Sequence, residues 1–226
     1  MIRFRLKWVF FIILASSVVA FFIGRKFESQ VRWRKLNSIF IVAENGSAIS
    51  IAANGPISAE DLEFLRFFAD RITEIQISGR DLANYNFSFL ASSRSLKRLT
   101  LNHSKIGLDA IEHLAHLDEL KTLEIRNIGV TDNELKCTIS NIDSLEDLSI
   151  GYNPVSFDGV VSLKHLTNLR HLELSGGMLT GSQIEEVKAL LPATCVVISD
   201  MRLGLEPVES KNSSEELTNE NMIRDE

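Results

Sequence analysis

The chain has 226 residues and a net charge of −6, and this charge is divided unevenly: residues 1–35 carry +7 and residues 204–226 carry −5. Taking both from the total leaves −8 for residues 36–203, a length that suits one domain with a sizeable core. An acidic domain argues against nucleic acid as a partner, because that affinity rests largely on cations that neutralise phosphates.

Residues 1–7 are basic and precede an uncharged run, WVFFIILASSVVAFFIG, at residues 8–24. Such a run forms a helix of about 25 Å, and Lys7 and Arg25 at its ends can extend outward to complete a crossing of roughly 30 Å. The alternative is a cleavable signal peptide with a small-residue site that ends at Ala20. The apolar run continues beyond Ala20, so we predict an uncleaved transmembrane anchor.

Residues 25–37 form a basic juxtamembrane stalk, predicted either as a continuing helix at the bilayer surface or as a solvated linker. Anionic lipid is the partner expected for this cluster. More basic residues follow the apolar run than precede it, which by the positive-inside rule favours a cytoplasmic main domain. Cleavage would instead place that domain outside. Weighing both, we favour the extracytoplasmic side of a single-pass protein by a narrow margin.

Residues 38–71 are predicted to form an N-terminal cap that consists of a hairpin and a helix. Two apolar stretches, SIFIV and SAISI, flank an Asn-Gly pair, which is a typical hairpin turn. Ser58 and Asp61 then mark a helix start, which is followed by apolar residues at helical spacing: Leu62, Leu65 and Phe68.

One pattern recurs through residues 72–203 at a nearly fixed period. The motif L-x-x-L-x-L, or a close variant, has six starts that lie 24, 24, 25, 24 and 24 residues apart: Ile72, Leu96, Leu120, Leu145, Leu169 and Ala193. The last two apolar positions of each copy alternate with a polar one, as a strand requires. More aliphatic residues recur later in each copy, and the third copy has its one extra residue in the segment that begins at Leu135.

Each copy therefore predicts a short strand, a turn and a return segment with helical or 3₁₀ spacing. One copy cannot bury its own apolar edge, so neighbouring copies must stack on a continuous core. Stacking places the strands in a parallel sheet on a concave face and the return segments on a convex face. Residues 72–203 then hold about five repeats and a terminal strand.

At these positions the chain resembles the leucine-rich-repeat family, and most of all its bacterial members with an N-terminal membrane segment. The resemblance implies an α/β solenoid with a curved parallel sheet, and a role in binding other proteins. The family often places Asn or Cys three residues past the L-x-L, where the side chain bonds to neighbouring backbone. Here only Asn153 fits, since the equivalent residues are Arg80, Ser104, Ile128 and Gly177.

The chain ends in an acidic segment, residues 204–226, that lacks aromatic residues. Such a composition supplies too little apolar surface to fold, so we predict disorder. A specific acidic binding tail is the alternative.

No motif for catalysis, a cofactor or a metal ion stands out, and we predict none of the three. His113 and His116 lie three residues apart, but the repeat pattern places them beside inward leucines and therefore facing solvent. Cys137 and Cys195 lie in different repeats, and we expect both to be buried as small hydrophobic residues.

The polar positions of the strands face away from the core and form the candidate surface for a protein partner. The candidates are charged, amide or aromatic residues of this surface, some of them of types that often anchor interfaces: Arg98, Asn102, Glu124, Arg126, Asp147, Tyr152, His171 and Glu173. Ordinary solvent-facing polarity is the alternative for each of them.

The leading hypothesis is a membrane-tethered module that binds a protein through its concave face. A structural envelope component or spacer is the second hypothesis. An enzyme is the third, because Glu124 and Glu173 lie two strands apart, a separation that suits paired catalytic carboxylates. Nothing else in the sequence supports catalysis, so we predict that the protein is not an enzyme.

Overall fold

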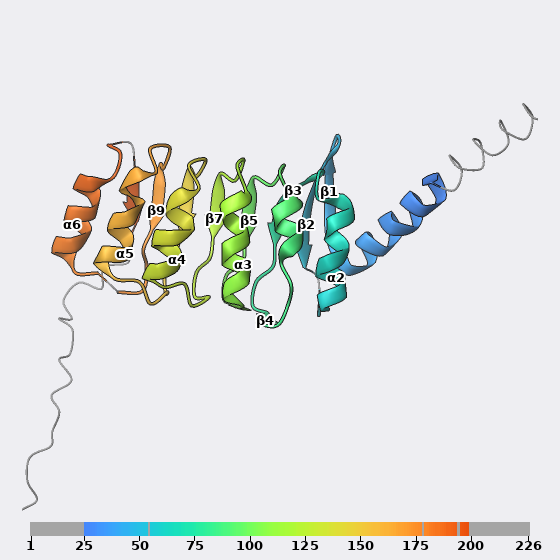
Figure 1. The fold of residues 1–226 in the computed structure, drawn as a ribbon, viewed down its shortest axis with the longest axis horizontal. Coiled ribbons are helices and arrows are strands. Elements are labelled where there is room, and N and C mark those ends of the chain that lie inside the picture. The colour runs from blue at the N-terminus through green and yellow to red at the C-terminus, as the bar shows by residue number, and fades with distance from the viewer. Residues whose placement is uncertain (1–24, 54, 178, 194, 199–226) are drawn as a thin grey trace, which may run out of the picture.

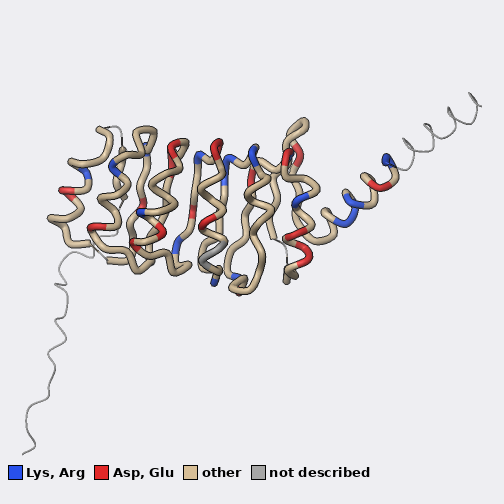
Figure 2. The backbone as a smooth tube through the Cα atoms, in the orientation of Figure 1, with Lys and Arg blue, Asp and Glu red and all other residues tan. Residues whose placement is uncertain are grey.

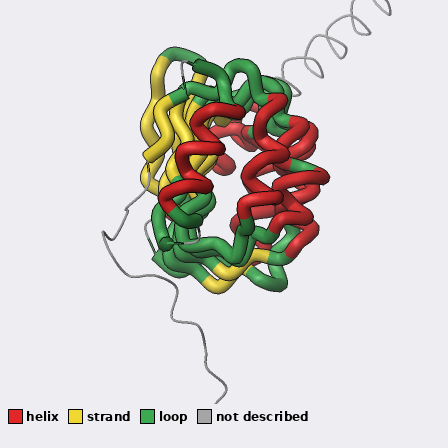
Figure 3. The backbone as a smooth tube through the Cα atoms, turned by 90° about the vertical axis from the view of Figure 1, so that its left-hand side faces the viewer, coloured by secondary structure: helices red, strands yellow, loops and turns green. Residues whose placement is uncertain are grey.

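A computed structural model of the chain describes residues 25–53, 55–177, 179–193 and 195–198. Repeating units stack along the long axis (Figure 1), with strands on one side and helices on the other (Figure 3). The predicted anchor at residues 8–24 and the predicted disordered tail at residues 204–226 lie outside the described residues. Within the described part of the chain, no helix is both long and apolar enough to cross a bilayer.

The basic segment after residue 24 is helical through residue 39. The end of this helix is anchored by Leu36, which is fully buried. The Trp33 ring also meets the Phe68 ring edge-on, with 6.0 Å between centroids. The helix is therefore attached to the folded domain by apolar contacts and is not merely a spacer.

The domain begins with a hairpin, in which β1 (Phe40–Asn45) pairs antiparallel with β2 (Ala48–Ala53). Gly46 takes a φ of 64° in the turn, a conformation that glycine adopts without steric cost. Helix α2 (Ala59–Phe64) follows, and Ser58 and Asp61 form a reciprocal capping box at its start. The 3₁₀ helix η1 (Leu65–Phe68) completes this cap.

The parallel strands form one sheet with the hairpin, because β2 pairs in parallel with the first repeat strand. The sheet order is β1-β2-β3-β5-β7-β8-β9-β10. The repeat strands are β3 (Ile72–Gln76), β5 (Arg98–Thr100), β7 (Thr122–Glu124), β8 (Asp147–Ser149), β9 (His171–Glu173) and β10 (Val196–Ile198). The predicted parallel sheet is thus confirmed, and a second small sheet pairs β4 (Asp81–Leu82) with β6 (Lys105–Ile106).

The return segments on the other side are short helices and 3₁₀ turns, as the three-residue spacing predicts. They are η2 (Ser88–Ser92), α3 (Leu108–Glu112), η3 (His113–His116), α4 (Asp132–Cys137), η4 (Ile139–Asn141), α5 (Phe157–Val161), η5 (Ser162–His165) and α6 (Gly181–Leu190). Leu135 and Ile139 are both fully buried although they are four residues apart. The extra residue of the third repeat is therefore absorbed where α4 passes into η4, and the strands keep their register.

Cys137 departs from the sequence prediction, because it is exposed rather than buried. It lies at the end of α4, two residues after the buried Leu135. Two residues turn a helix by about 200°, which directs Cys137 to the opposite side from the core. Cys195 is partly buried, and burial raises the pKa of its thiol.

Contacts between neighbouring return segments also use polar groups. The Asp132 carboxylate accepts hydrogen bonds from the backbone N–H and the hydroxyl of Ser156 in the next repeat, at 2.7 and 2.6 Å. The Ser156 hydroxyl contributes most to lowering the pKa of Asp132, and this outweighs the effect of burial. Gly159 makes room for the contact, because a Cβ at that position would lie 2.1 Å from Asp132 Oδ1.

Within the core, strands β3, β5, β7, β8 and β9 each contribute one aliphatic residue to a row, here named the ladder. The register aligns these five residues, which are all at most 1% exposed: Ile75, Leu99, Leu123, Leu148 and Leu172. We predict that Leu148→Ala lowers the free energy of unfolding by about 2–5 kcal/mol, because the cavity opens between two repeats. Urea denaturation of the full chain in mild detergent measures the loss.

The matched control for this substitution is Lys188→Ala on the outer side of α6, which should change the free energy by less than about 0.5 kcal/mol. A loss at Leu148 as small as that of the control would contradict the assigned register.

A second prediction concerns pH. Asp132 has a lowered pKa in the folded state, so its ionised form stabilises the fold above the unfolded value, 3.8. That contribution is lost as the pH falls through the folded-state pKa, below 3.8. The stability difference between wild type and Asp132→Asn should therefore narrow between about pH 5 and about pH 2. Urea denaturation of both proteins across this range tests it, and a constant difference would disprove the assignment.

Candidate interaction face

The outward side of strands β3, β5, β7, β8 and β9, here named the strand face, carries the predicted partner-binding residues. Each strand directs its ladder residue inward and the residues on either side of it toward the opposite side of the sheet, where Thr100 and Thr122 are covered by their neighbours. The register aligns these outward residues in two rows: Glu74, Arg98, Thr122, Asp147 and His171, and then Gln76, Thr100, Glu124, Ser149 and Glu173.

Five charged side chains form a connected network across this face. Arg98 Nε lies 3.2 Å from Glu74 Oε1, and Arg98 Nη1 lies 3.5 Å from Glu124 Oε1. Arg126 continues the network, at 4.0 Å from Glu124 Oε2 and 3.9 Å from Glu173 Oε2. These last two separations are ion pairs but too long for hydrogen bonds, and Arg126 Nε and Glu173 Oε2 are buried without a hydrogen-bond partner.

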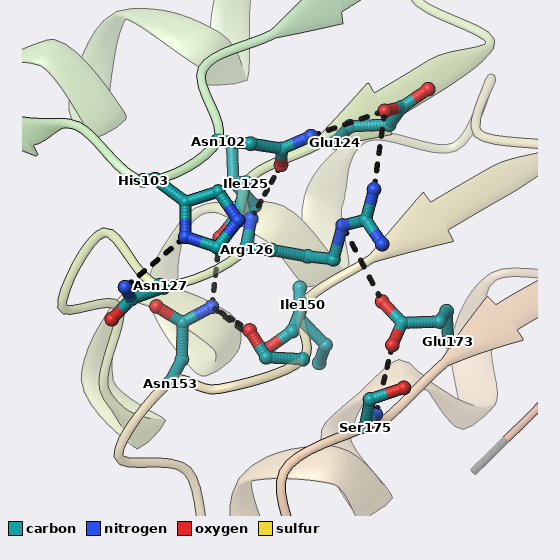
Figure 4. Close-up of polar contacts among 11 residues, drawn as sticks. Asn102, His103, Glu124, Ile125, Arg126, Asn127, Ile150, Asn153, Glu173 and Ser175 are labelled. Carbon is teal, nitrogen blue, oxygen red and sulfur yellow. Dashed lines mark hydrogen bonds and ion pairs between the residues drawn. The ribbon is translucent and has the colours of Figure 1, made fainter. Parts of the chain in front are cut away.

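Neighbouring groups hold the acids of this network in place (Figure 4). Asn102 is buried, and its amide donates to Glu124 Oε2 at 3.2 Å and accepts from the backbone N–H of Arg126 at 2.8 Å. Glu173 Oε1 accepts from the backbone N–H of Ser175 at 3.0 Å. A Cβ at Gly151 would lie 2.7 Å from that same oxygen, so glycine there leaves room for the carboxylate.

A hollow of about 370 Å³ lies on the strand face over β5, β7, β8 and β9, and Ile198 of β10 also lines it. Five of the eight predicted binding residues line it: Arg98, Glu124, Asp147, His171 and Glu173. Its floor includes Thr122 and Ser149, and His171 Nδ1 is paired with Asp147 Oδ1 at one side. The structure therefore brings these five together, with Asn102 and Arg126 bonded to the same network.

Tyr152 is the predicted residue that the structure separates from this hollow. It lies in the turn after β8, is half-exposed, and lines a different hollow of about 490 Å³ with His103, Asn127, Pro154 and neighbouring residues. Its backbone is left-handed, with φ of 59°. The turn conformation thus directs Tyr152 away from the residues of the strand face.

The same position of the turn is left-handed in five successive repeats. Glycine takes it in the first and the fifth, at Gly79 and Gly176, whereas residues with side chains take it in between: His103, Asn127 and Tyr152. A left-handed backbone costs residues with a Cβ roughly 1 kcal/mol or more. Sequence reasoning missed this row, although aligning the copies places Gly79 and Gly176 in one column and so marks the conformation that the column requires.

The turns satisfy their backbone groups by continuing the hydrogen-bonded ladder from one repeat to the next. The backbone N–H groups of Gly79, His103, Asn127 and Tyr152 donate to carbonyls of the following repeat at 2.7–3.0 Å. Ser104 also accepts from the backbone N–H of Arg80, at 3.3 Å. These bonds replace the asparagine ladder that the sequence lacks.

Asn153 performs the role that the family resemblance implies for it. Its side-chain oxygen accepts from the backbone N–H groups of residues 128, 129 and 130 at 3.0–3.2 Å. Its amide nitrogen donates to the carbonyls of Ile125 and Ile150, both at 2.7 Å. One buried side chain therefore joins the third repeat to the fourth.

The structure also places the residues of two chemistries that the sequence argues against, paired catalytic carboxylates and a histidine metal site. Arg126 ion-pairs with both Glu124 and Glu173, so a cation lies between the two carboxylates. His116 is exposed and His113 is partly buried on the helix side. No group of three or more His, Cys, Asp or Glu within the described ranges is placed to hold a metal ion.

No protein-family model matches the chain, and no curated protein matches it either. Among solved structures, an internalin from Listeria monocytogenes is similar, with a TM-score of 0.46 and 20% sequence identity. The similarity covers 73% of this chain and 48% of the internalin chain, so the chain spans about half the length of that neighbour. The leucine-rich-repeat type of fold assigned to this chain rests on its own strand registers and buried ladder.

We predict that Asn153→Ala lowers the free energy of unfolding by roughly 3 kcal/mol, because it leaves several buried backbone groups without a partner. Urea denaturation of the full chain in mild detergent measures the change. Asn168 supplies the control, since its amide makes one exposed hydrogen bond to the Asp143 carbonyl, and Asn168→Ala should cost under about 1 kcal/mol. Equal losses in the two variants would refute the joining role of Asn153.

Proposed function

We propose that this protein is a membrane-tethered interaction module that binds another protein through the strand face. The observation that carries the proposal is the hollow on that face, with its network of charges fixed by buried neighbours. Solenoids of this type offer their sheet as a broad binding surface. The tether rests on the uncharged run at residues 8–24, and the proposal includes no catalytic step.

The network prepares the strand face for a partner, because its charged groups are ordered before binding. Arg98 and Arg126 are each partly exposed while they contact acids on both sides. Their charges are therefore available to a partner, and less side-chain entropy is lost when the complex forms. Arginine in such a position often dominates an interface.

The shape of the hollow favours a protein over a small molecule. It is open to solvent and spreads over five strands, whereas small-molecule sites enclose most of their ligand. Its lining combines the acids Glu124, Asp147 and Glu173 with Arg98 and His171, and such a charge pattern selects a partner by complementary charge. The domain as a whole is acidic, which argues against nucleic acid.

The test places a photo-crosslinking amino acid at Gln76 or Ser149 in the full chain, in intact membranes. The control positions are Lys164 and Ser182 on the helix side. We predict a discrete protein adduct from the strand-face positions and none from the helix side. Adding Arg98→Glu and Arg126→Glu should lower the adduct yield at least tenfold, which corresponds to about 1.4 kcal/mol of binding.

The matched charge control is Lys164→Glu with Lys188→Glu, which changes the net charge equally and should leave the adduct unchanged. Circular dichroism of each variant checks that the domain stays folded. Adducts that form equally from both sides, or that persist after the arginine reversals, would exclude the strand face as the binding site. Full function of a chain that lacks residues 72–203 would support a structural spacer instead.

A further inference from the structure

The junction between the helix over residues 25–39 and the cap contains a further hollow, of about 520 Å³. Three arginines line it, two from the helix and one from the turn before β3, together with three aromatic rings and one acid: Arg32, Arg34, Arg71, Trp33, Phe67, Phe68 and Glu44. This hollow, here named the arginine hollow, is separate from the strand face and has no part in the proposed protein binding.

The walls of the arginine hollow are fixed by stacking contacts. The Arg32 guanidinium lies over the Phe67 ring, 4.2 Å from its centroid, and Lys35 lies over Phe64 at 4.6 Å. Arg71 lies over the Trp33 ring at 5.4 Å. Each cation thus joins the helix to the cap across an aromatic ring, so the site exists without a ligand.

The charge of the hollow is unbalanced. Its three arginines face one glutamate, which leaves a net charge of +2. Arg32 is 3.7 Å from Glu28, and Arg71 is 4.0 Å from Glu44, both beyond hydrogen-bond distance. The Arg34 side chain makes no hydrogen bond or ion pair with any described residue. Guanidinium donors therefore remain for an anion, and their planar fork matches the oxygens of a phosphate.

Exposed apolar side chains occur both on this helix and in the hollow. Phe27 is 67% exposed and Val31 is 49% exposed, and they are four residues apart on one face of the helix. Phe67, which lines the hollow, is 45% exposed. Figure 2 shows the basic residues of the same helix, which extends away from the acidic repeats. Cations, aromatic rings and apolar residues on one helix are the composition of a segment that lies in a membrane interface.

We propose that the arginine hollow binds the phosphate of an anionic phospholipid headgroup, an inference that rests on the proposed membrane tether. A lipid is favoured over free phosphate because apolar side chains border the cations and because the uncharged run at residues 8–24 directly precedes the helix. The headgroup is held by Arg32, Arg34 and Arg71, and the exposed Phe67 ring of the same hollow contacts the lipid beside them.

This site has a geometric consequence. From residue 25 to residue 33 the helix rises about 12 Å, whereas the headgroup layer of one leaflet is roughly 5–8 Å thick. A helix perpendicular to the bilayer would hold the arginine hollow above the phosphates. Lipid binding therefore requires the helix to lean toward the membrane plane.

The experiment uses the fluorescence of Trp33, which lies in the hollow. The chain has two tryptophans, and Trp8→Phe leaves Trp33 as the only one. The full chain is incorporated into nanodiscs that contain a nitroxide-labelled lipid, either phosphatidylserine or phosphatidylcholine at equal mole fraction. We expect labelled phosphatidylserine to quench Trp33 at least threefold more strongly. Combined Arg32→Gln, Arg34→Gln and Arg71→Gln should abolish the preference, while Arg34→Gln alone, which removes no internal contact, should reduce it.

The control variant removes three positive charges elsewhere, by Lys164→Gln, Arg170→Gln and Lys188→Gln, and should keep the threefold preference. Equal quenching by the two labelled lipids in the wild-type arginine background would overturn the proposal. Loss of the preference on adding inorganic phosphate at constant ionic strength would reassign the site to free phosphate. Failure of the chain to enter nanodiscs would overturn the tether and the headgroup site together, whereas entry without a lipid preference would overturn only the headgroup site.

Discussion

Each repeat of this chain has an apolar edge that only its neighbours can cover, and the ladder from Ile75 to Leu172 is the result. Because side chains alternate along a strand, the register that buries Leu148 also places Asp147 and Ser149 outside. Core and candidate face are therefore two consequences of one constraint. A one-residue slip would exchange them and bury charge.

The turns decide how the outward residues are held. Continued backbone hydrogen bonds and the Asn153 side chain fix the turns between the third and fourth repeats. Asn102 and Gly151 then set the positions of Glu124 and Glu173, one by donating a hydrogen bond and the other by leaving space. The charges of the strand face thus depend on residues that carry no charge themselves.

The sequence predicts what repeats and misses what depends on a single contact. Period and alternation determine the strands, the ladder and the sides of the sheet, and they placed Arg98, Glu124, Asp147, His171 and Glu173 on one surface. They do not determine the left-handed turns that separate Tyr152 from that surface, because a single residue in each repeat, such as Gly79 or Gly176, indicates the left-handed backbone. The packing of the basic helix on the cap could not be predicted from the sequence either, because cation–ring pairs such as Arg32 with Phe67 follow no periodic pattern.

The cap connects the two proposed binding sites mechanically. The basic helix packs on α2 and η1 through Trp33, Leu36 and its cation–ring contacts, and β2 pairs directly with β3. A helix that leans toward the bilayer to place a headgroup in the arginine hollow would therefore turn the whole sheet with it. Because the strands are in one hydrogen-bonded sheet, the angle of this helix would then set the direction in which the strand face meets a partner.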